Sequence, residues 1–218
     1  MPQIFSVHAN LLARLGLAAL LGLPVLLIAL ALLYVRSPWF TGTGVAKAQP
    51  VPFSHAHHVG DDGIDCRYCH TRVEVSANAG LPSTDVCMSC HSRLWNQAPM
   101  LAPVRASLAL DEPIAWRRVH DLPDFVYFDH SVHVNNGVAC VSCHGRVDRM
   151  PLTRQVRSLQ MGWCLDCHRD PGPQLRAPQA VFDPAGKAPA GTSAGAEALL
   201  AAYAIHPDTL TDCSTCHR

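Results

Sequence analysis

All ten cysteines of this 218-residue chain occur in five copies of one short pattern, Cys-x-x-Cys-His. Residues three and four apart lie on one face of a helical turn, so both thiols and the imidazole point to the same side. This arrangement suits covalent haem attachment, with two thioether bonds to the haem and a histidine on the iron. The five copies are Cys66, Cys69 and His70; Cys87, Cys90 and His91; Cys140, Cys143 and His144; Cys164, Cys167 and His168; and Cys213, Cys216 and His217.

Zinc sites and disulfides also use Cys-x-x-Cys, but neither needs a histidine directly after the second cysteine every time. The five units leave no cysteine over. We therefore predict five haem c groups, each bound by one cysteine pair and by the following histidine as its proximal iron ligand. Phe, Trp and Tyr make up only 6% of the residues, against 17 Pro and 14 Gly. A chain so poor in core residues depends on its cofactors for a core.

The N-terminal region carries an uncharged, Leu- and Ala-rich run from Leu15 to Val35, bracketed by Arg14 and Arg36. As a helix it would span about 30 Å, the thickness of the bilayer hydrocarbon. We predict a single-pass anchor in the cytoplasmic membrane, surrounded by lipid. The alternative is a signal peptide cleaved near Ala46-Lys47-Ala48. The flanking charges orient the anchor poorly. Haem attachment takes place outside bacterial membranes, so residues 1–14 are expected in the cytoplasm and the haem domain in the periplasm.

An internal repeat organises the rest of the chain. The segment 53–58, Phe-Ser-His-Ala-His-His, is echoed by 128–133, Phe-Asp-His-Ser-Val-His, and each leads through a glycine into a haem motif. We predict a mostly α-helical fold with much irregular structure, in which two duplicated dihaem units are followed by a fifth haem. The predicted segments are linker 36–50, dihaem unit 51–97, linker 98–114, dihaem unit 115–170, Pro/Ala/Gly-rich arm 171–196 and fifth-haem segment 197–218.

Two of these segments are expected to lack regular structure, because they are rich in Pro, Ala and Gly. The stretch 98–113 is expected to be loop-like. For the arm, disorder and an ordered course over a partner subunit remain open. A short helix is expected at 197–205, before the fifth haem.

Five haems with both axial positions filled need five distal ligands. The repeated pattern makes His55, His58, His130 and His133 the best candidates, since histidines three apart on a helix can serve neighbouring haems. We choose His120 as the fifth distal ligand. Val132 replaces His57 in the second copy, so His57 is expected to be a bystander, and His8 lies before the anchor. Weaker candidates for a distal position are His206, Met150 and Met161, and methionine would raise the haem potential.

Several linking sequences are more specific than the haem motifs themselves. They are Phe53-Ser54-His55, Gly80-Leu81-Pro82 before Cys87-Met88-Ser89-Cys90-His91, Arg118-Val119-His120-Asp121-Leu122-Pro123, and Met161-Gly162-Trp163-Cys164-Leu165-Asp166-Cys167-His168-Arg169. Over nearly the whole chain these segments resemble the pentahaem cytochrome c subunit of alternative complex III. The long arm before the fifth haem departs from that family's pattern.

The resemblance implies a fold close to the class III multihaem cytochromes and a place in a quinol:acceptor oxidoreductase. It implies polytopic quinol-oxidising membrane subunits, an iron–sulfur subunit, and a small cytochrome c, another soluble carrier or a terminal oxidase as acceptor. The chain itself would relay electrons, with no catalytic residue of its own. The formal net charge of zero gives no basis for a nucleic-acid partner.

Two alternatives of other classes stay open. One is a multihaem reductase, in which one iron keeps an open position for substrate. The other is a membrane cytochrome that oxidises quinol directly through one haem. A vacant iron is disfavoured by the number of spare histidines. Direct quinol oxidation is disfavoured because one helix makes a poor quinone pocket.

Overall fold

The computed structural model describes residues 4–186 and 193–217. The chain divides into two compact units, Met1–Gly42 and Thr43–Arg218. The first unit contains α1 (Ala9–Arg36) and the single-turn helix α2 (Pro38–Thr41). Helix α1 includes the predicted apolar span and begins before it. No residue of α1 is buried, and its 28 residues correspond to about 42 Å. By length and composition alone it could cross a membrane, a test that an N-terminal signal sequence also passes.

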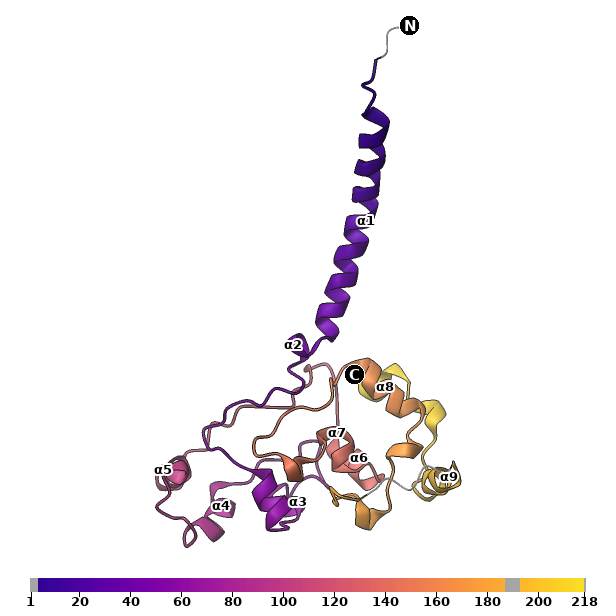
Figure 1. The fold of residues 1–218 in the computed structure, drawn as a ribbon. Coiled ribbons are helices and arrows are strands. Elements are labelled where there is room, and N and C mark those ends of the chain that lie inside the picture. Colours follow the sequence, from indigo (N-terminus) through magenta and orange to yellow (C-terminus); the bar gives the residue numbers. More distant parts are fainter. Residues whose placement is uncertain (1–3, 187–192, 218) are drawn as a thin grey trace. The chain divides into compact units, whose positions relative to one another are not determined.

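The second unit consists of short helices joined by irregular chain (Figure 1). Among the described residues its only β-pairing is two isolated bridges, between Ala46 and Arg154 and between Val138 and Leu175. The predicted fold class, mostly helical with much irregular structure, is therefore confirmed. Its α-helices are α3 (Cys66–Cys69), α4 (Thr84–His91), α5 (Ala102–Leu110), α6 (His130–Asn135), α7 (Cys140–His144), α8 (Met161–Arg169), α9 (Ser193–Ala202) and α10 (Cys213–Cys216). Shorter turns are the π-helix η1 (Ala56–Asp61) and the 3-10 helices η2 (Pro99–Leu101), η3 (Val147–Arg149), η4 (Gly172–Gln174), η5 (Pro178–Ala180) and η6 (Pro207–Thr209).

Side chains supply only small hydrophobic clusters in this unit. One cluster contains Val51, Leu101 and Val104, and a second contains Val73, Val134 and Val181. Many apolar side chains are exposed even outside the apolar helix α1. Helices of four to ten residues are unstable alone in water, so these clusters do not by themselves account for an ordered domain.

The expectation of a loop at 98–113 is wrong, because η2 and α5 form there. Pro99 and Pro103 lie in the first turns of these helices, where proline is tolerated since those amide hydrogens would be unsatisfied in any case. Leu101 and Val104 then bury their side chains against α4, which holds them in place. Proline is typical both of loops and of helix starts, so the sequence pattern alone does not predict this helix.

The arm is ordered along this chain over residues 171–186. Leu175 is completely buried, and the backbone N–H of Arg176 donates to the carbonyl of Gly137. The N–H of Cys140 donates to the carbonyl of Val181. This part of the arm packs on the second unit of its own chain, and residues 187–192 lie outside the described residues. The helix expected at 197–205 is present as α9, displaced towards the N-terminus.

Replacing Leu175 by alanine should lower the free energy of unfolding by about 2–5 kcal/mol, because a fully buried leucine leaves a cavity. Denaturant titration followed by haem absorbance measures this loss. Leu110→Ala is the matched control, since Leu110 is 66% exposed and its truncation should change stability by no more than about 0.5 kcal/mol. Equal effects of the two substitutions would contradict the packing of the arm.

Candidate haem-binding sites

The cysteine pairs of all five Cys-x-x-Cys-His motifs lie on helical turns, as their spacing predicts, whereas His70 and His217 follow the last helical residue of their motifs. The pairs occupy α3, α4, α7, α8 and α10. All ten cysteines are free, so no disulfide competes for the thiols. A side-chain cap begins one of these turns: the carboxylate of Asp65 accepts a hydrogen bond from the backbone N–H of Arg67 at the start of α3. The cysteine pairs are therefore available for thioether bonds.

The predicted proximal histidines share one hydrogen-bonding pattern. In four of them Nδ1 lies at hydrogen-bond distance from a backbone carbonyl, which can only accept, so Nδ1 carries the hydrogen. The lone pair is then on Nε2, the nitrogen available to a metal. The pairs are His70 with Gly80 at 2.8 Å, His91 with Leu94 at 3.1 Å, His168 with Leu210 at 2.8 Å and His217 with Phe125 at 3.0 Å.

Nδ1 is also hydrogen-bonded in the four predicted distal histidines of the repeat. The partner of His55 is the hydroxyl of Thr153, at 2.9 Å. The remaining three donate to carbonyls: His58 to Ser54 at 2.9 Å, His130 to Ala77 at 2.8 Å and His133 to Asp129 at 2.7 Å. Eight of the ten predicted histidine ligands thus have Nδ1 engaged and Nε2 as the remaining nitrogen, which is the arrangement that fits iron ligation.

The other two, His120 and His144, lie together in the interior, with ring centres 4.4 Å apart. Burial lowers the pKa of His144 to about 3, and the nearby His120 adds to the shift. Burial also lowers the pKa of His120. Both rings are therefore neutral at pH 7. Nε2 of His120 is buried without a hydrogen-bond partner, which is costly unless a ligand such as a metal uses its lone pair.

Three pairs of rings have the separation expected for two histidines on one iron. Metal–nitrogen bonds of about 2 Å on each side place such ring centres about 6 Å apart. The observed separations are 6.1 Å for His58 and His91, 6.1 Å for His133 and His168, and 6.3 Å for His130 and His144. Each pair joins a predicted distal histidine to a predicted proximal one. His55 lies close to His70, whose charge, after burial, contributes to lowering the pKa of His55 to about 4.

The two copies of the repeated pattern have closely similar geometry. Phe53 packs edge-on to His55 and is stacked on His58, at 4.9 and 4.4 Å between ring centres. Phe128 packs on its two histidines at 4.8 and 4.5 Å in the same orientations. The first copy has one more residue between its second histidine and its haem motif. The π-helix η1 accommodates that extra residue, whereas the second copy forms the α-helix α6.

The weaker candidates are placed differently. His57 contacts the carboxylates of Asp61 at 3.7 Å and Asp62 at 3.4 Å, and its ring stacks on Trp95. These partners account for His57 without an iron. His206 and His8 are exposed. Met161 is 67% exposed at the start of α8, and Met150 is 3% exposed. Neither His8 nor His206 pairs with another histidine ring among the described residues.

The first motif contacts both the second and the third. The hydroxyls of Tyr68 and Ser89, each between the two cysteines of its motif, are 2.9 Å apart. The thiols of Cys66 and Cys140 lie close together, and their interaction lowers the pKa of Cys66 and raises that of Cys140. The first motif therefore lies between the second and the third.

The third motif continues to the fourth, and the fourth to the fifth. Burial raises the pKa of Cys143 to about 11, with added contributions from the charges of Cys167 and Cys164 nearby. The hydrogen bond from His168 to Leu210 connects the fourth motif to the segment that enters the fifth. The motifs therefore follow one another in space in the order second, first, third, fourth, fifth.

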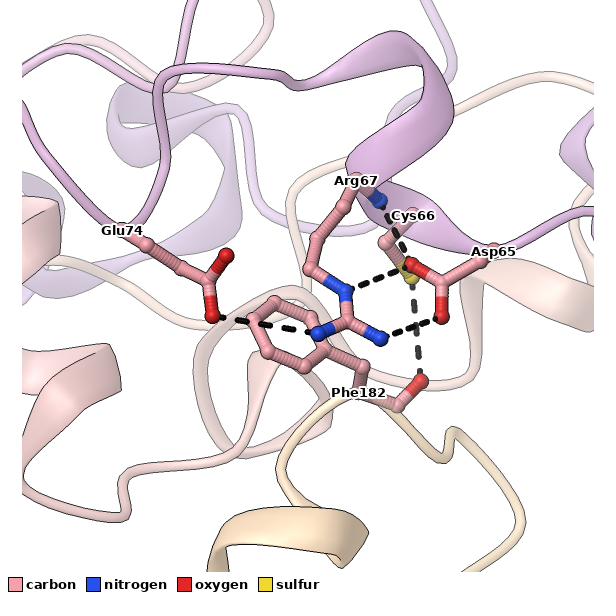
Figure 2. Close-up of polar contacts among 5 residues, drawn as sticks. All are labelled: Asp65, Cys66, Arg67, Glu74 and Phe182. Carbon is pink, nitrogen blue, oxygen red and sulfur yellow. Dashed lines mark hydrogen bonds and ion pairs between the residues drawn. The ribbon is translucent and has the colours of Figure 1, made fainter.

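The arm is attached to the first motif through Arg67 and Cys66 (Figure 2). Arg67 forms a two-pronged ion pair with Asp65 at 2.9 Å, approaches Glu74 at 3.8 Å and lies 4.3 Å above the ring of Phe182. The Cys66 thiol donates to the carbonyl of Phe182 at 3.8 Å. Sequence patterns gave no sign of these contacts, nor of Thr153 and the carbonyl partners of the histidines, because backbone acceptors have no residue signature.

Comparison with known proteins agrees with this geometry. Residues 126–218, which include the last three motifs, match the family model described as cytochrome c7 and related cytochrome c. This part of the chain is therefore similar to multihaem c-type cytochromes. Over 99 residues it is 38% identical to the menaquinone reductase multihaem cytochrome c subunit of Nitratidesulfovibrio vulgaris, strain Hildenborough. The matched stretch covers 45% of this chain and 46% of that relative, so the chain spans less than half of the relative's length.

Proposed function

We propose that the chain is a membrane-anchored pentahaem cytochrome that relays electrons between quinol and a periplasmic acceptor. The observation that carries this proposal is the continuous succession of the five attachment motifs, in the order second, first, third, fourth, fifth. Bound haem would supply one-electron redox chemistry. The chain's own residues hold the sites in sequence, and the hydrogen-bonded Nδ1 atoms fix the orientation of the imidazoles.

The ring separations and the hydrogen bonds at Nδ1 support the following ligand assignment. The ten cysteines would hold five haem c groups, with His70, His91, His144, His168 and His217 as proximal ligands. The ring pairs favour His58 opposite His91 and His133 opposite His168. His120 and His130 both lie beside His144, and the position of His55 favours His70. Of the weaker candidates, His206 is the remaining histidine in the fifth-haem segment. The matching geometry of the two repeats supports their origin as duplicated dihaem units.

The pairing of His58 with His91 predicts a local effect of His58→Met. One haem should change its low-spin EPR signal and its potential should rise, because a methionine ligand raises the potential relative to histidine. The other four haems should be unaffected. His57→Gln is the matched control, because the ring of His57 contacts Asp61, Asp62 and Trp95 and is not expected to bind iron. This substitution should leave every haem signal unchanged. Unaltered spectra in the His58→Met protein would contradict the pairing.

The N-terminal unit supports anchoring in the membrane. Trp39 and Phe40 follow the apolar helix directly and are 90% and 59% exposed. Aromatic side chains of this kind gather where the hydrocarbon meets water. We place the helix in the cytoplasmic membrane, with the first residues in the cytoplasm and the haem domain in the periplasm.

The remaining partners come from the resemblance to alternative complex III. They are polytopic quinol-oxidising subunits, an iron–sulfur subunit, and a small cytochrome c, another soluble carrier or an oxidase as acceptor. The chain would not be catalytic alone.

A second candidate function follows from the named relative, a subunit of a menaquinone reductase. In that function the same relay would run in the opposite direction, from a periplasmic donor to menaquinone. Rapid-mixing measurements on the complex purified with its partners separate the two. If menaquinol reduces the haems and a soluble cytochrome c reoxidises them, the quinol-oxidising function holds. If only a reduced periplasmic donor reduces the haems and menaquinone reoxidises them, the menaquinone-reducing function replaces the quinol-oxidising one.

A further inference from the structure

Three separate segments of the second unit are joined by hydrogen bonds soon after the N-terminal unit ends. Ala46 forms a β-bridge with Arg154, and the N–H of Gly44 donates to the carbonyl of Gln155 at 2.7 Å. The side chain of Gln49 bonds to both the N–H and the carbonyl of Arg117, each at 2.9 Å. Segments 44–49, 117–118 and 154–157 therefore lie side by side.

This surface carries a concentration of exposed cations, which we call the basic collar. Its members are Lys47, Arg117, Arg118, Arg154 and Arg157. Hydrogen bonds fix the collar locally: Nζ of Lys47 donates to the carbonyl of Arg118 at 2.9 Å, and Nε of Arg157 donates to that of Ser142 at 3.3 Å. Of the five collar cations, Arg118 alone forms an ion pair with another described residue, Asp121, at 2.8 Å.

The grouping of five cations in the basic collar is informative because the whole chain is electrically balanced. It has 17 basic and 17 acidic residues, with a formal net charge of zero. A solvated surface of average composition would mix the two signs. Like charges brought together repel one another, so an anionic partner would stabilise the collar.

The position of the collar in the chain indicates which anion. The apolar helix α1 ends at Arg36, and even a fully extended chain from there to Lys47 reaches at most about 40 Å. The aromatic side chains of α2 lie between them in sequence. We propose that the basic collar binds the anionic headgroups of phospholipids in the membrane that holds α1. This inference rests on the proposed anchoring of the chain.

The chemistry fits headgroup recognition by several cations. Arginine guanidinium groups bind phosphate oxygens through paired hydrogen bonds. Basic residues next to a membrane attract anionic lipids with an effect of about fivefold in affinity for each residue. Binding would hold the haem domain near the membrane surface, where quinol is oxidised.

The test uses the full-length haem-loaded chain in mixed micelles of equal amounts of phosphatidylglycerol and phosphatidylcholine. The lipids retained after removal of excess micelles are counted by mass spectrometry. We expect phosphatidylglycerol to be enriched about fivefold over phosphatidylcholine. The double variant Arg117→Gln/Arg154→Gln removes two of the five cations and should lower this ratio towards one. Arg72→Gln/Arg93→Gln removes two exposed arginines elsewhere and should keep the enrichment.

Each other outcome overturns the inference. A ratio near one in the unmodified chain means that the collar does not select anionic lipid. An equal loss in both double variants means a general charge effect. Displacement of the lipid by excess inorganic phosphate identifies free phosphate as the ligand. Unchanged retention with loss of a co-purifying subunit identifies an acidic protein partner. Haem absorbance is recorded on each sample as a separate measurement. Loss of the haem signals would count against the electron-transfer proposal, whereas the lipid ratio tests the basic collar.

Discussion

Replacing His144 by alanine should stop electron transfer through the chain. The third motif lies in the middle of the spatial order, in contact with the first motif through Cys140 and near the fourth through Cys143. No other described contact joins the first motif to the fourth. We expect the rate from quinol to a soluble acceptor to fall by more than about 100-fold, beyond the loss caused by outer-shell partners of a metal. Rapid mixing of the reconstituted complex measures it.

Two controls make this result specific. Cys140 and Cys143 remain in the variant, so the covalently bound haem content should stay at five and shows that the chain is assembled. His144→Met keeps an iron ligand and should retain measurable transfer with a raised potential at one haem. Unimpaired transfer in the His144→Ala protein would show that electrons do not pass through the third motif.

Chain made without haem should lose most of its structure in the second unit. Where the structure describes this unit, its α-helices have no more than ten residues and its buried side chains form small clusters. Neither feature stabilises a domain of this size. We expect circular dichroism of the full-length haem-free chain in detergent to retain mainly the signal of α1, because the backbone hydrogen bonds of that helix are formed within the helix itself.

The comparison spectrum is that of the haem-loaded chain in the same detergent. Its additional helical signal should disappear with the haem. A haem-free spectrum that matches the loaded one would contradict the idea that the cofactors form the core.

Patterns in the sequence predicted the local features of the sites well. The Cys-x-x-Cys-His spacing predicts that its residues share one helical turn, and every cysteine pair does lie on such a turn, although His70 and His217 follow the last helical residue of theirs. The repeated Phe-x-His-x-x-His pattern led to two phenylalanine–histidine clusters of similar geometry. Both predictions depend on residues close in sequence, where spacing alone fixes which side chains share a face.

Features that depend on long-range contacts could not be predicted in this way. Segment 98–113 is helical although its proline content favours a loop, because Leu101 and Val104 are buried against α4. The arm is held by Leu175 and by backbone hydrogen bonds to Gly137, which have no sequence signature. The spatial order of the motifs likewise differs from their order along the chain.

The central claim is that all five irons have two axial ligands and serve only to relay electrons. Low-temperature EPR of the purified haem-loaded chain, combined with a redox titration, tests it most directly. The account predicts five low-spin haems whose signals titrate separately, with none that binds an added ligand. A high-spin haem that binds nitrite or another small ligand would contradict the relay and favour a multihaem reductase.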